Sequence, residues 1–173
     1  EDQEMVRALV KGQLEYYGVH SDPSQASYHY STGDGLMGLS LYLETGGPNE
    51  VGSDVTVDVG IANTIQSIQA NQGTSLPNNN GGWNYYSPGT NGDLSVTQFA
   101  AAGLAASENV VAGGVESMPR LIEFLVSDQS SNGGLSYRPA GRSPTPQMSA
   151  SGLWCYRLAQ VPVEDDRVQQ ALG

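Results

Sequence analysis

The sequence has 173 residues, 38% of them hydrophobic and 14% charged, which is enough apolar material for one globular domain with a core. Eighteen acidic residues stand against seven basic ones, so the net charge is −11. A surface this acidic repels phosphate backbones, and we expect no nucleic-acid binding. The 22 glycines are too many for a plain helical bundle and indicate long loops between elements.

Membrane insertion and disulfide bonding are excluded by simple counts. No apolar run approaches the roughly 18 residues that a membrane-spanning helix needs. The single cysteine, Cys155, cannot form an internal disulfide, and its position in an apolar run predicts a buried side chain. A single lysine, Lys11, among many Asn, Ser, Thr and Gly residues is typical of exported proteins. We therefore expect an extracytoplasmic location, periplasmic or secreted.

The N-terminal part predicts a pair of unlike helices. Residues 5–16 form an amphipathic helix with charges on one side, as expected for an outer helix facing solvent. A loop with Tyr28, His29 and Tyr30 follows, and then a small-residue helix over Leu36–Leu43. We interpret this pair as a first, degenerate copy of a repeat at about residues 4–45.

Two clearer copies follow, at about residues 54–107 and 115–160. Their first helices share an apolar stripe that ends in glutamine, because Ile61, Ile65, Ile68 and Gln72 recur 57 residues later as Met118, Ile122, Leu125 and Gln129. A glycine loop comes next, and Gly81-Gly82-Trp83-Asn84-Tyr85 recurs as Gly133-Gly134-Leu135-Ser136-Tyr137. Tyr30, Tyr85 and Tyr137 would occupy one repeat position. A fourth copy begins within residues 163–173.

The second helix of each copy is nearly uncharged and rich in Ala, Gly and Ser. Thr97–Leu104 aligns with Pro146–Leu153 in this interpretation. Small residues allow close approach of neighbouring helices, so these segments predict buried inner helices. The predicted fold is all-α, a curved two-layer array of about three outer/inner helix pairs with glycine-rich aromatic loops.

The run of Gln72, Gly81-Gly82-Trp83 and then Asp93 to Ala100 resembles the repeats of prenyltransferases and squalene cyclases, including their Gln-Trp (QW) motif. Gln129 with Gly133-Gly134-Leu135 resembles a version without the tryptophan. The resemblance implies an α/α-toroid, in which inner helices form a barrel inside a ring of outer helices. The chain resembles about half of one toroid, so uncovered inner-helix surface predicts self-association or a protein partner.

The same resemblance argues against cyclase chemistry. Cyclases of this family carry an Asp-x-Asp-Asp-Thr motif, whereas this chain has Asp93-Leu94-Ser95-Val96-Thr97. Ser95 and Val96 replace two carboxylates that would hold the catalytic proton. We expect Asp93 or Ser95 to cap a helix instead.

Other catalytic sets are incomplete as well. A prenyltransferase-like zinc site would need Asp, Cys and His together, but the histidines, His20 and His29, lie far from Cys155 in the sequence. Glycan hydrolysis needs two placed carboxylates or a Tyr/His pair, and Asp34, Asp93 and His29 show no recognisable spacing. His29 could be a base, although a hydrogen-bonded structural role fits better. We expect no metal and no cofactor.

Aromatic loop residues are the best candidates for a ligand surface, because their rings can stack on sugars or hold an apolar ligand. The candidate ligand-binding residues are His29, Tyr30, Trp83, Tyr85, Tyr86, Asp93 and Tyr137. For Trp83, a structural role between outer and inner helices is the favoured alternative.

The sequence therefore favours a non-catalytic helical-repeat module for protein–protein assembly or for binding an apolar or glycan ligand. The alternative is half of a cyclase-like or polysaccharide-active toroid enzyme whose catalytic residues lie outside these 173 residues.

Overall fold

The computed structural model describes residues 2–16, 29–75, 79–85, 91–139 and 143–173, which form seven α-helices and a two-stranded ribbon. The α-helices are α1 (Asp2–Tyr16), α2 (His29–Glu44), α3 (Val57–Ala70), α4 (Leu94–Ser107), α5 (Met118–Asp128), α6 (Pro146–Leu158) and α7 (Asp166–Leu172). The ribbon pairs β1 (Thr74–Ser75) with β2 (Asn79–Asn80), and the 3-10 helix η1 (Gly114–Ser117) precedes α5. Among these described residues, no helix combines the length and apolar character of a membrane span.

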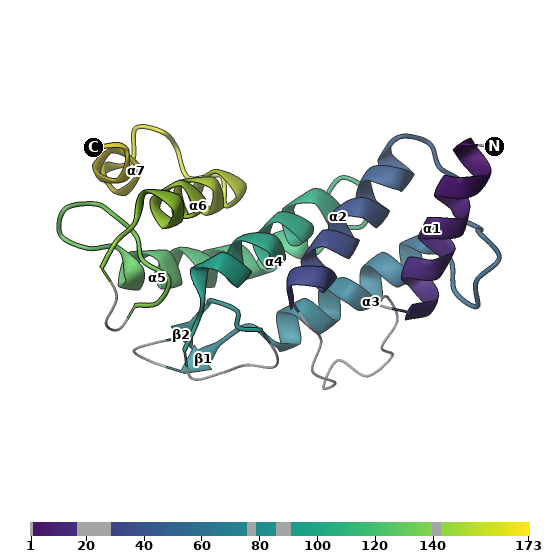
Figure 1. Ribbon diagram of the computed structural model, residues 1–173, viewed down its shortest axis with the longest axis horizontal. Coiled ribbons are helices and arrows are strands. Elements are labelled where there is room, and N and C mark those ends of the chain that lie inside the picture. The colour runs from purple at the N-terminus through teal and green to yellow at the C-terminus, as the bar shows by residue number, and fades with distance from the viewer. Residues whose placement is uncertain (1, 17–28, 76–78, 86–90, 140–142) are drawn as a thin grey trace.

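The helices form two layers, as expected. Helices α2, α4 and α6 make up the inner layer, with α4 in contact with both of the others, while α1, α3, α5 and α7 form the outer layer (Figure 1). Helix α4 is buried over most of its surface, because ten of its fourteen residues are buried. Helices α1 and α7 lie at opposite ends of the array (Figure 1).

Close contact between α2 and α4 depends on glycine. A Cβ atom added to Gly33 would lie 2.3 Å from the backbone oxygen of Phe99, and one added to Gly103 would lie 2.7 Å from the backbone oxygen of Gly33. Real side-chain carbons do not approach carbonyl oxygens this closely. The small-residue composition of the inner helices therefore sets the distance between them.

The two glutamines of the repeat make the same pair of hydrogen bonds. The Gln72 side-chain nitrogen donates to the carbonyl oxygens of Gly81 (2.9 Å) and Ser117 (3.0 Å). The Gln129 side-chain nitrogen donates to those of Gly133 (3.0 Å) and Arg167 (2.8 Å). In both cases one bond fixes the glycine loop, and the other fixes the backbone at or just before the start of the next outer helix.

The glycine loops are equivalent in backbone conformation. Gly81 and Gly133 have φ values of +101° and +86°, and a Cβ at either would lie within 2 Å of a carbonyl oxygen of α5 or α7. Glycine is therefore required at both positions by conformation and by space. Trp83 and Leu135 follow in the core, both fully buried, and the indole Nε1 of Trp83 donates to the Ile68 carbonyl (2.7 Å).

The structure corrects the alignment of the inner helices. The Thr97 hydroxyl accepts from the Trp83 backbone N–H, and the Ser149 hydroxyl accepts from that of Leu135. Thr97 therefore corresponds to Ser149, and the expected match with Pro146 is wrong by three residues. The small-residue pattern of these helices is too uniform to fix a register from sequence.

The start of α2 also differs from the expectation. His29 and Tyr30 were expected in a loop, with the helix limited to Leu36–Leu43, but α2 begins at His29 and ends at Glu44. Long-range contacts hold the first turn, since the His29 backbone N–H donates to the Tyr85 carbonyl (3.1 Å).

Two alanine substitutions in α2 test the glycine contact. Gly33→Ala should lower the free energy of unfolding by about 1–3 kcal/mol, because its Cβ would push α4 away. Gly38→Ala is the matched control: nothing lies within 4 Å of a Cβ there, so better helix propensity should raise stability by up to about 1 kcal/mol. Urea denaturation of dilute protein measures both. Equal effects of the two substitutions would contradict the role given to Gly33.

Candidate functional site

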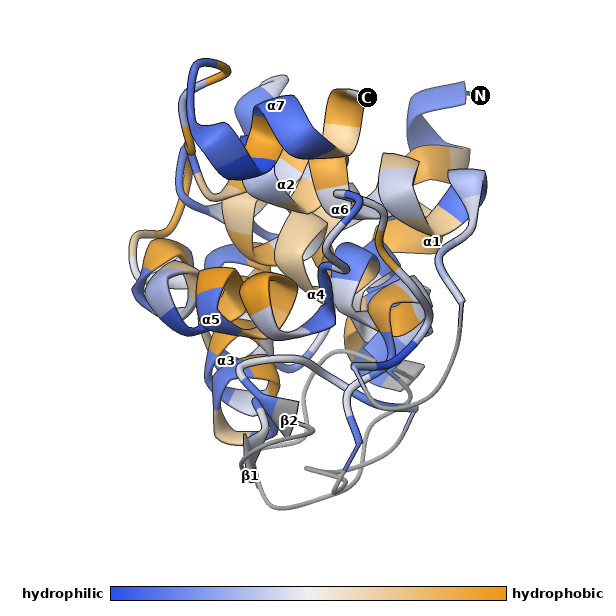
Figure 2. Cartoon of the chain, turned by 90° about the vertical axis from the view of Figure 1, so that its left-hand side faces the viewer, coloured by the Kyte–Doolittle hydropathy of each residue, from blue (hydrophilic) through white to orange (hydrophobic). Residues whose placement is uncertain are grey.

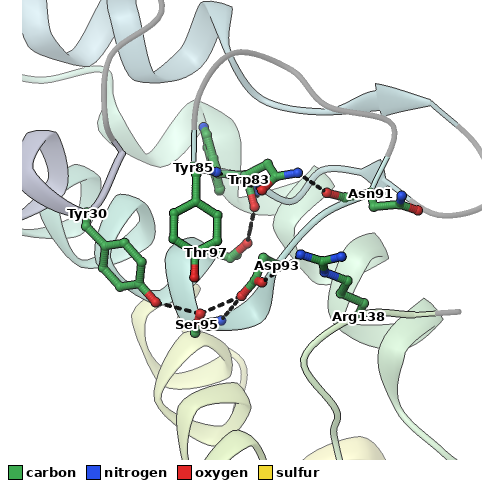
Figure 3. Close-up of polar contacts among 9 residues, drawn as sticks. Tyr30, Trp83, Tyr85, Asn91, Asp93, Ser95, Thr97 and Arg138 are labelled. Carbon is green, nitrogen blue, oxygen red and sulfur yellow. Dashed lines mark hydrogen bonds and ion pairs between the residues drawn. The ribbon is translucent and has the colours of Figure 1, made fainter. Parts of the chain in front are cut away.

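Side chains from both ends of the chain's sequence pattern meet at the N-terminal ends of α2 and α4. Tyr30 comes from the first turn of α2, Asp93 and Ser95 from the start of α4, and Tyr85 and Arg138 from the loops that follow the two glycine pairs (Figure 3). Gly82 and Gly134 lie just ahead of these loop residues in the sequence. The repeat thus delivers two loops to one end of the inner layer.

Asp93 is the N-cap of α4, as expected. Its Oδ1 accepts from the Ser95 backbone N–H (3.0 Å) and from the Ser95 hydroxyl (2.5 Å). Its Oδ2 lies 3.5 Å from a guanidinium nitrogen of Arg138. Both carboxylate oxygens therefore have cationic or hydrogen-bonding partners, and the carboxylate is held in one orientation.

Tyr30 extends this polar chain. Its hydroxyl donates to Ser95 Oγ at 2.6 Å, and the Ser95 hydroxyl in turn donates to Asp93. The Tyr85 ring lies 5.5 Å from the Tyr30 ring, and both hydroxyls point toward Ser95 (Figure 3). Partial burial raises the pKa of Tyr30 above its usual value, so the phenol stays protonated at neutral pH.

An aromatic row crosses the inner layer next to this polar chain. The ring of Tyr30 lies 5.1 Å from that of Phe99, which lies 6.5 Å from the ring of Trp154 in an edge-to-face arrangement. With Tyr85, four rings follow one another from the loop before α4 across α2 and α4 to α6. Trp154 is 40% exposed, and the other three are half-buried. The row therefore presents partly accessible aromatic surface.

His29 is placed as a structural residue. Its side chain is fully buried, and Nδ1 lies 2.5 Å from the Asn84 carbonyl oxygen. Because a carbonyl only accepts, Nδ1 carries the hydrogen and Nε2 is the acceptor of the neutral ring. Burial lowers the pKa of His29 from its usual value, which favours this neutral form. A fully buried ring is out of reach of a ligand on the inner surface.

The remaining candidates lie in different surroundings. Trp83 is completely buried between α3 and α4, away from the aromatic row. The carbonyl of Tyr137 accepts from the Leu94 backbone N–H (2.9 Å), which joins its loop to the start of α4. Tyr86 lies outside the described residues.

Asp128, at the end of α5, was not anticipated. It is 5% exposed, and its two oxygens accept from the hydroxyl and the backbone N–H of Ser136. Burial raises its pKa to about 6, and the negative charge of Asp93 adds to the shift. The aligned position in the preceding copy is the neutral Asn71, which could have marked the site as one where a carboxylate is out of place.

Metal and thiol chemistry find no support among the described residues. No group of His, Cys, Asp and Glu side chains there has the arrangement of a metal site. Cys155 is completely buried, as expected, and burial raises its pKa to about 12. A thiol of this kind behaves as a small hydrophobic group.

No family model matches the sequence, and no curated protein matches it. Among solved structures, the chain is similar to cellobiose 2-epimerase from Spirochaeta thermophila DSM 6192, with a TM-score of 0.62 and 13% sequence identity. The match covers 99% of this chain and 53% of that one, so this chain spans about half the length of that protein. The likeness concerns the fold, which is of the α/α-toroid type.

Asp128→Asn should change the pH dependence of stability. The folded-state pKa of Asp128, about 6, lies above the ordinary value of 3.8, so its contribution is largest below about pH 4 and is lost as the pH rises through 6. Relative to the parent chain, the variant should gain on the order of 1–3 kcal/mol of unfolding free energy between about pH 4 and pH 7.

Parallel denaturation curves at these pH values measure that gain, and the comparison cancels other groups that titrate in both proteins. The lowered pKa of His29 acts in the opposite direction, since its penalty grows as the pH falls below 6.5, and it is common to both proteins. A pH profile that is the same in parent and variant would contradict the burial of a costly charge at Asp128.

Proposed function

We propose that this chain is a non-catalytic module, built as part of an α/α-toroid, that binds a carbohydrate ligand on its inner face. The single observation that carries the proposal is the aromatic row of Tyr85, Tyr30, Phe99 and Trp154 beside the polar chain from Tyr30 to Asp93. In this proposal the copies at about 4–45, 54–107 and 115–160, with a fourth starting in 163–173, together form the module, and its extracytoplasmic location remains a prediction.

The chemistry of the row fits a sugar better than a purely apolar ligand. The faces of aromatic rings cover the C–H faces of sugar rings, while neighbouring hydroxyl groups need hydrogen-bond partners. The hydroxyl of Tyr30 and the guanidinium of Arg138, which is 40% exposed, lie next to the rings. An extended ligand could use several rings in succession, because they continue across three helices and a loop.

Catalysis is not part of the proposal, for reasons of geometry. Asp93 is engaged as a helix cap and ion-pair partner, Ser95 stands where the cyclase motif has a carboxylate, and His29 is enclosed in the core. A general acid or base needs to reach the substrate. None of these three groups meets that condition together with a free proton-transfer atom.

A second candidate is half of a toroid enzyme, cyclase-like or polysaccharide-active, with its catalytic residues outside these 173. The observation in its favour is that the chain aligns with 53% of an epimerase chain that bears the name of a disaccharide. The inner-face surface would then bind substrate, and the missing half would supply the acid and base. Both candidates place a sugar in the same position and differ in turnover.

Calorimetric titration with cellobiose and cellohexaose tests the binding proposal. Saturable binding is expected, tighter for the longer sugar. Tyr30→Ala should raise the dissociation constant at least about tenfold, because it removes the central ring of the row. Tyr42→Phe is the matched control on the same helix, since it removes a hydroxyl outside the row and should leave the affinity unchanged.

Tyr85→Ala provides a second variant in a loop, in case Tyr30→Ala disturbs α2. Absence of saturable binding to either sugar, or equal affinity in the Tyr30, Tyr85 and Tyr42 variants, would overturn the proposal. The proton NMR spectrum of cellobiose incubated with the chain separates the two candidates: a binding module leaves it unchanged, whereas turnover would support an enzyme.

A further inference from the structure

Large apolar side chains that remain exposed gather at the two ends of the helix array. Among the described residues, Met5, Val6 and Leu9 lie on α1 and Leu41 on α2; Trp154 lies on α6, Val163 between α6 and α7, and Leu172 on α7. On the central outer helices the corresponding residues are Val59 and Val126. Figure 2, which faces the α7 end, shows apolar turns on α7 beside hydrophilic ones. Exposed apolar surface confined to the ends indicates contacts that continue the array.

The N-terminal end carries a groove between α1 and α2 with a volume of about 580 Å³. Its α1 wall includes Val6, Leu9 and Val10, and its α2 wall includes Gly35 and Gly38. It continues along Val6 into a second hollow of about 390 Å³. We call this feature the N-terminal groove. Its walls are the free side of the first inner helix and the outer helix beside it.

The glycine positions on this wall resemble those of the established α2–α4 interface. On the α4 side, Gly33 allows the backbone of Phe99 to come close. On the groove side, nothing lies within 4 Å of a Cβ at Gly38. Helix α2 is thus shaped for close approach on two sides and has a helix partner from the inner layer on one.

The opposite end of the array carries the surface that would continue it. Trp154, Val163 and Leu172 are 40%, 56% and 58% exposed, and they lie on or between the last inner helix and the last outer helix. We call these three residues the C-terminal edge. In the solved toroid that this chain resembles, a single chain is nearly twice as long, and this chain covers 53% of it. Two copies therefore supply about the helical content of one such chain.

We propose that the C-terminal edge of a second copy of this chain docks into the N-terminal groove, so that two copies associate head to tail and extend the inner layer from α6 of one copy to α2 of the other. The contact joins two different surfaces, and a pair of half-arrays can close through two such contacts. The proposal is independent of the sugar-binding function, because a monomer could bind sugar and a dimer could lack that activity.

Light scattering over a range of concentrations tests the association, first with the parent chain. The expected result is a reversible shift from monomer to dimer. Gly38→Gln should weaken the dimer at least about tenfold by filling the groove, while the open space and better helix propensity keep the monomer folded. Gly12→Gln is the matched control, because it makes the same change in α1 outside the groove, also in open space.

A second pair of variants tests the other surface. Leu172→Gln should weaken the dimer by a similar factor, whereas Val126→Gln, at a 48% exposed valine on the central helix α5, should not. A head-to-tail contact also predicts complementation. A mixture of the Gly38→Gln and Leu172→Gln proteins retains one intact contact between the unmutated groove and the unmutated edge, so dimers should reappear on mixing.

Several outcomes would overturn the proposal. These are a parent chain that stays monomeric up to millimolar concentration, edge variants that associate as well as their controls, and a mixture that fails to restore dimers after both single variants have lost them. The last result would indicate a symmetric contact that uses one surface twice. Circular dichroism of each variant confirms that loss of association is not loss of fold.

Discussion

The structure depends on one buried interaction that each clear copy of the repeat contains, the bridging amide of a glutamine side chain. Gln72 ties the Gly81 carbonyl to the backbone before α5, and Gln129 ties the Gly133 carbonyl to the start of α7. Each amide thus joins the end of one outer helix, the glycine loop and the beginning of the next outer helix. Carbonyl groups buried there without a donor would cost free energy comparable to lost hydrogen bonds.

Fixing the glycine loops also fixes the inner-face site. The loop that begins at Gly81 runs through buried Trp83, whose carbonyl accepts from the Asp93 backbone N–H at 2.8 Å, and so sets where α4 starts. The Tyr85 carbonyl, in the same loop, accepts from the first turn of α2. Through these bonds a structural repeat element brings Tyr85, Asp93 and the beginning of α2 to one place. The site is a consequence of how the repeat closes its loops.

The repeat pattern predicted the architecture well because it is carried by local signals. Glutamine, paired glycines and an apolar stripe recur with helical spacing, and each has a direct counterpart in the structure. Start positions were harder to predict. His29 and Tyr30 belong to a helix because they contact the distant loop at Asn84 and Tyr85, and no local signal in the sequence indicates that contact.

The candidate site was predicted in part for the same reason. Tyr30, Tyr85 and Asp93 were expected from residue type and position, and they do come together. Arg138 and Asp128 were missed, since a charged residue after a loop or at a helix end usually faces solvent. Their roles depend on partners far away in the sequence or in another element, Asp93 for Arg138 and Ser136 for Asp128.

The unfolding free energies of Gln72→Met and Gln129→Met, measured against Gln98→Met, test the central role of the bridging amides most directly. Methionine keeps most of the side-chain volume and removes both donors. Gln98, on α4, donates within its own helix to the Ser95 carbonyl and serves as the reference. Each bridging variant should lose about 2 kcal/mol or more, because two carbonyls are left without their donor, and Gln98→Met should lose under about 1 kcal/mol. Equal losses in all three would contradict the account.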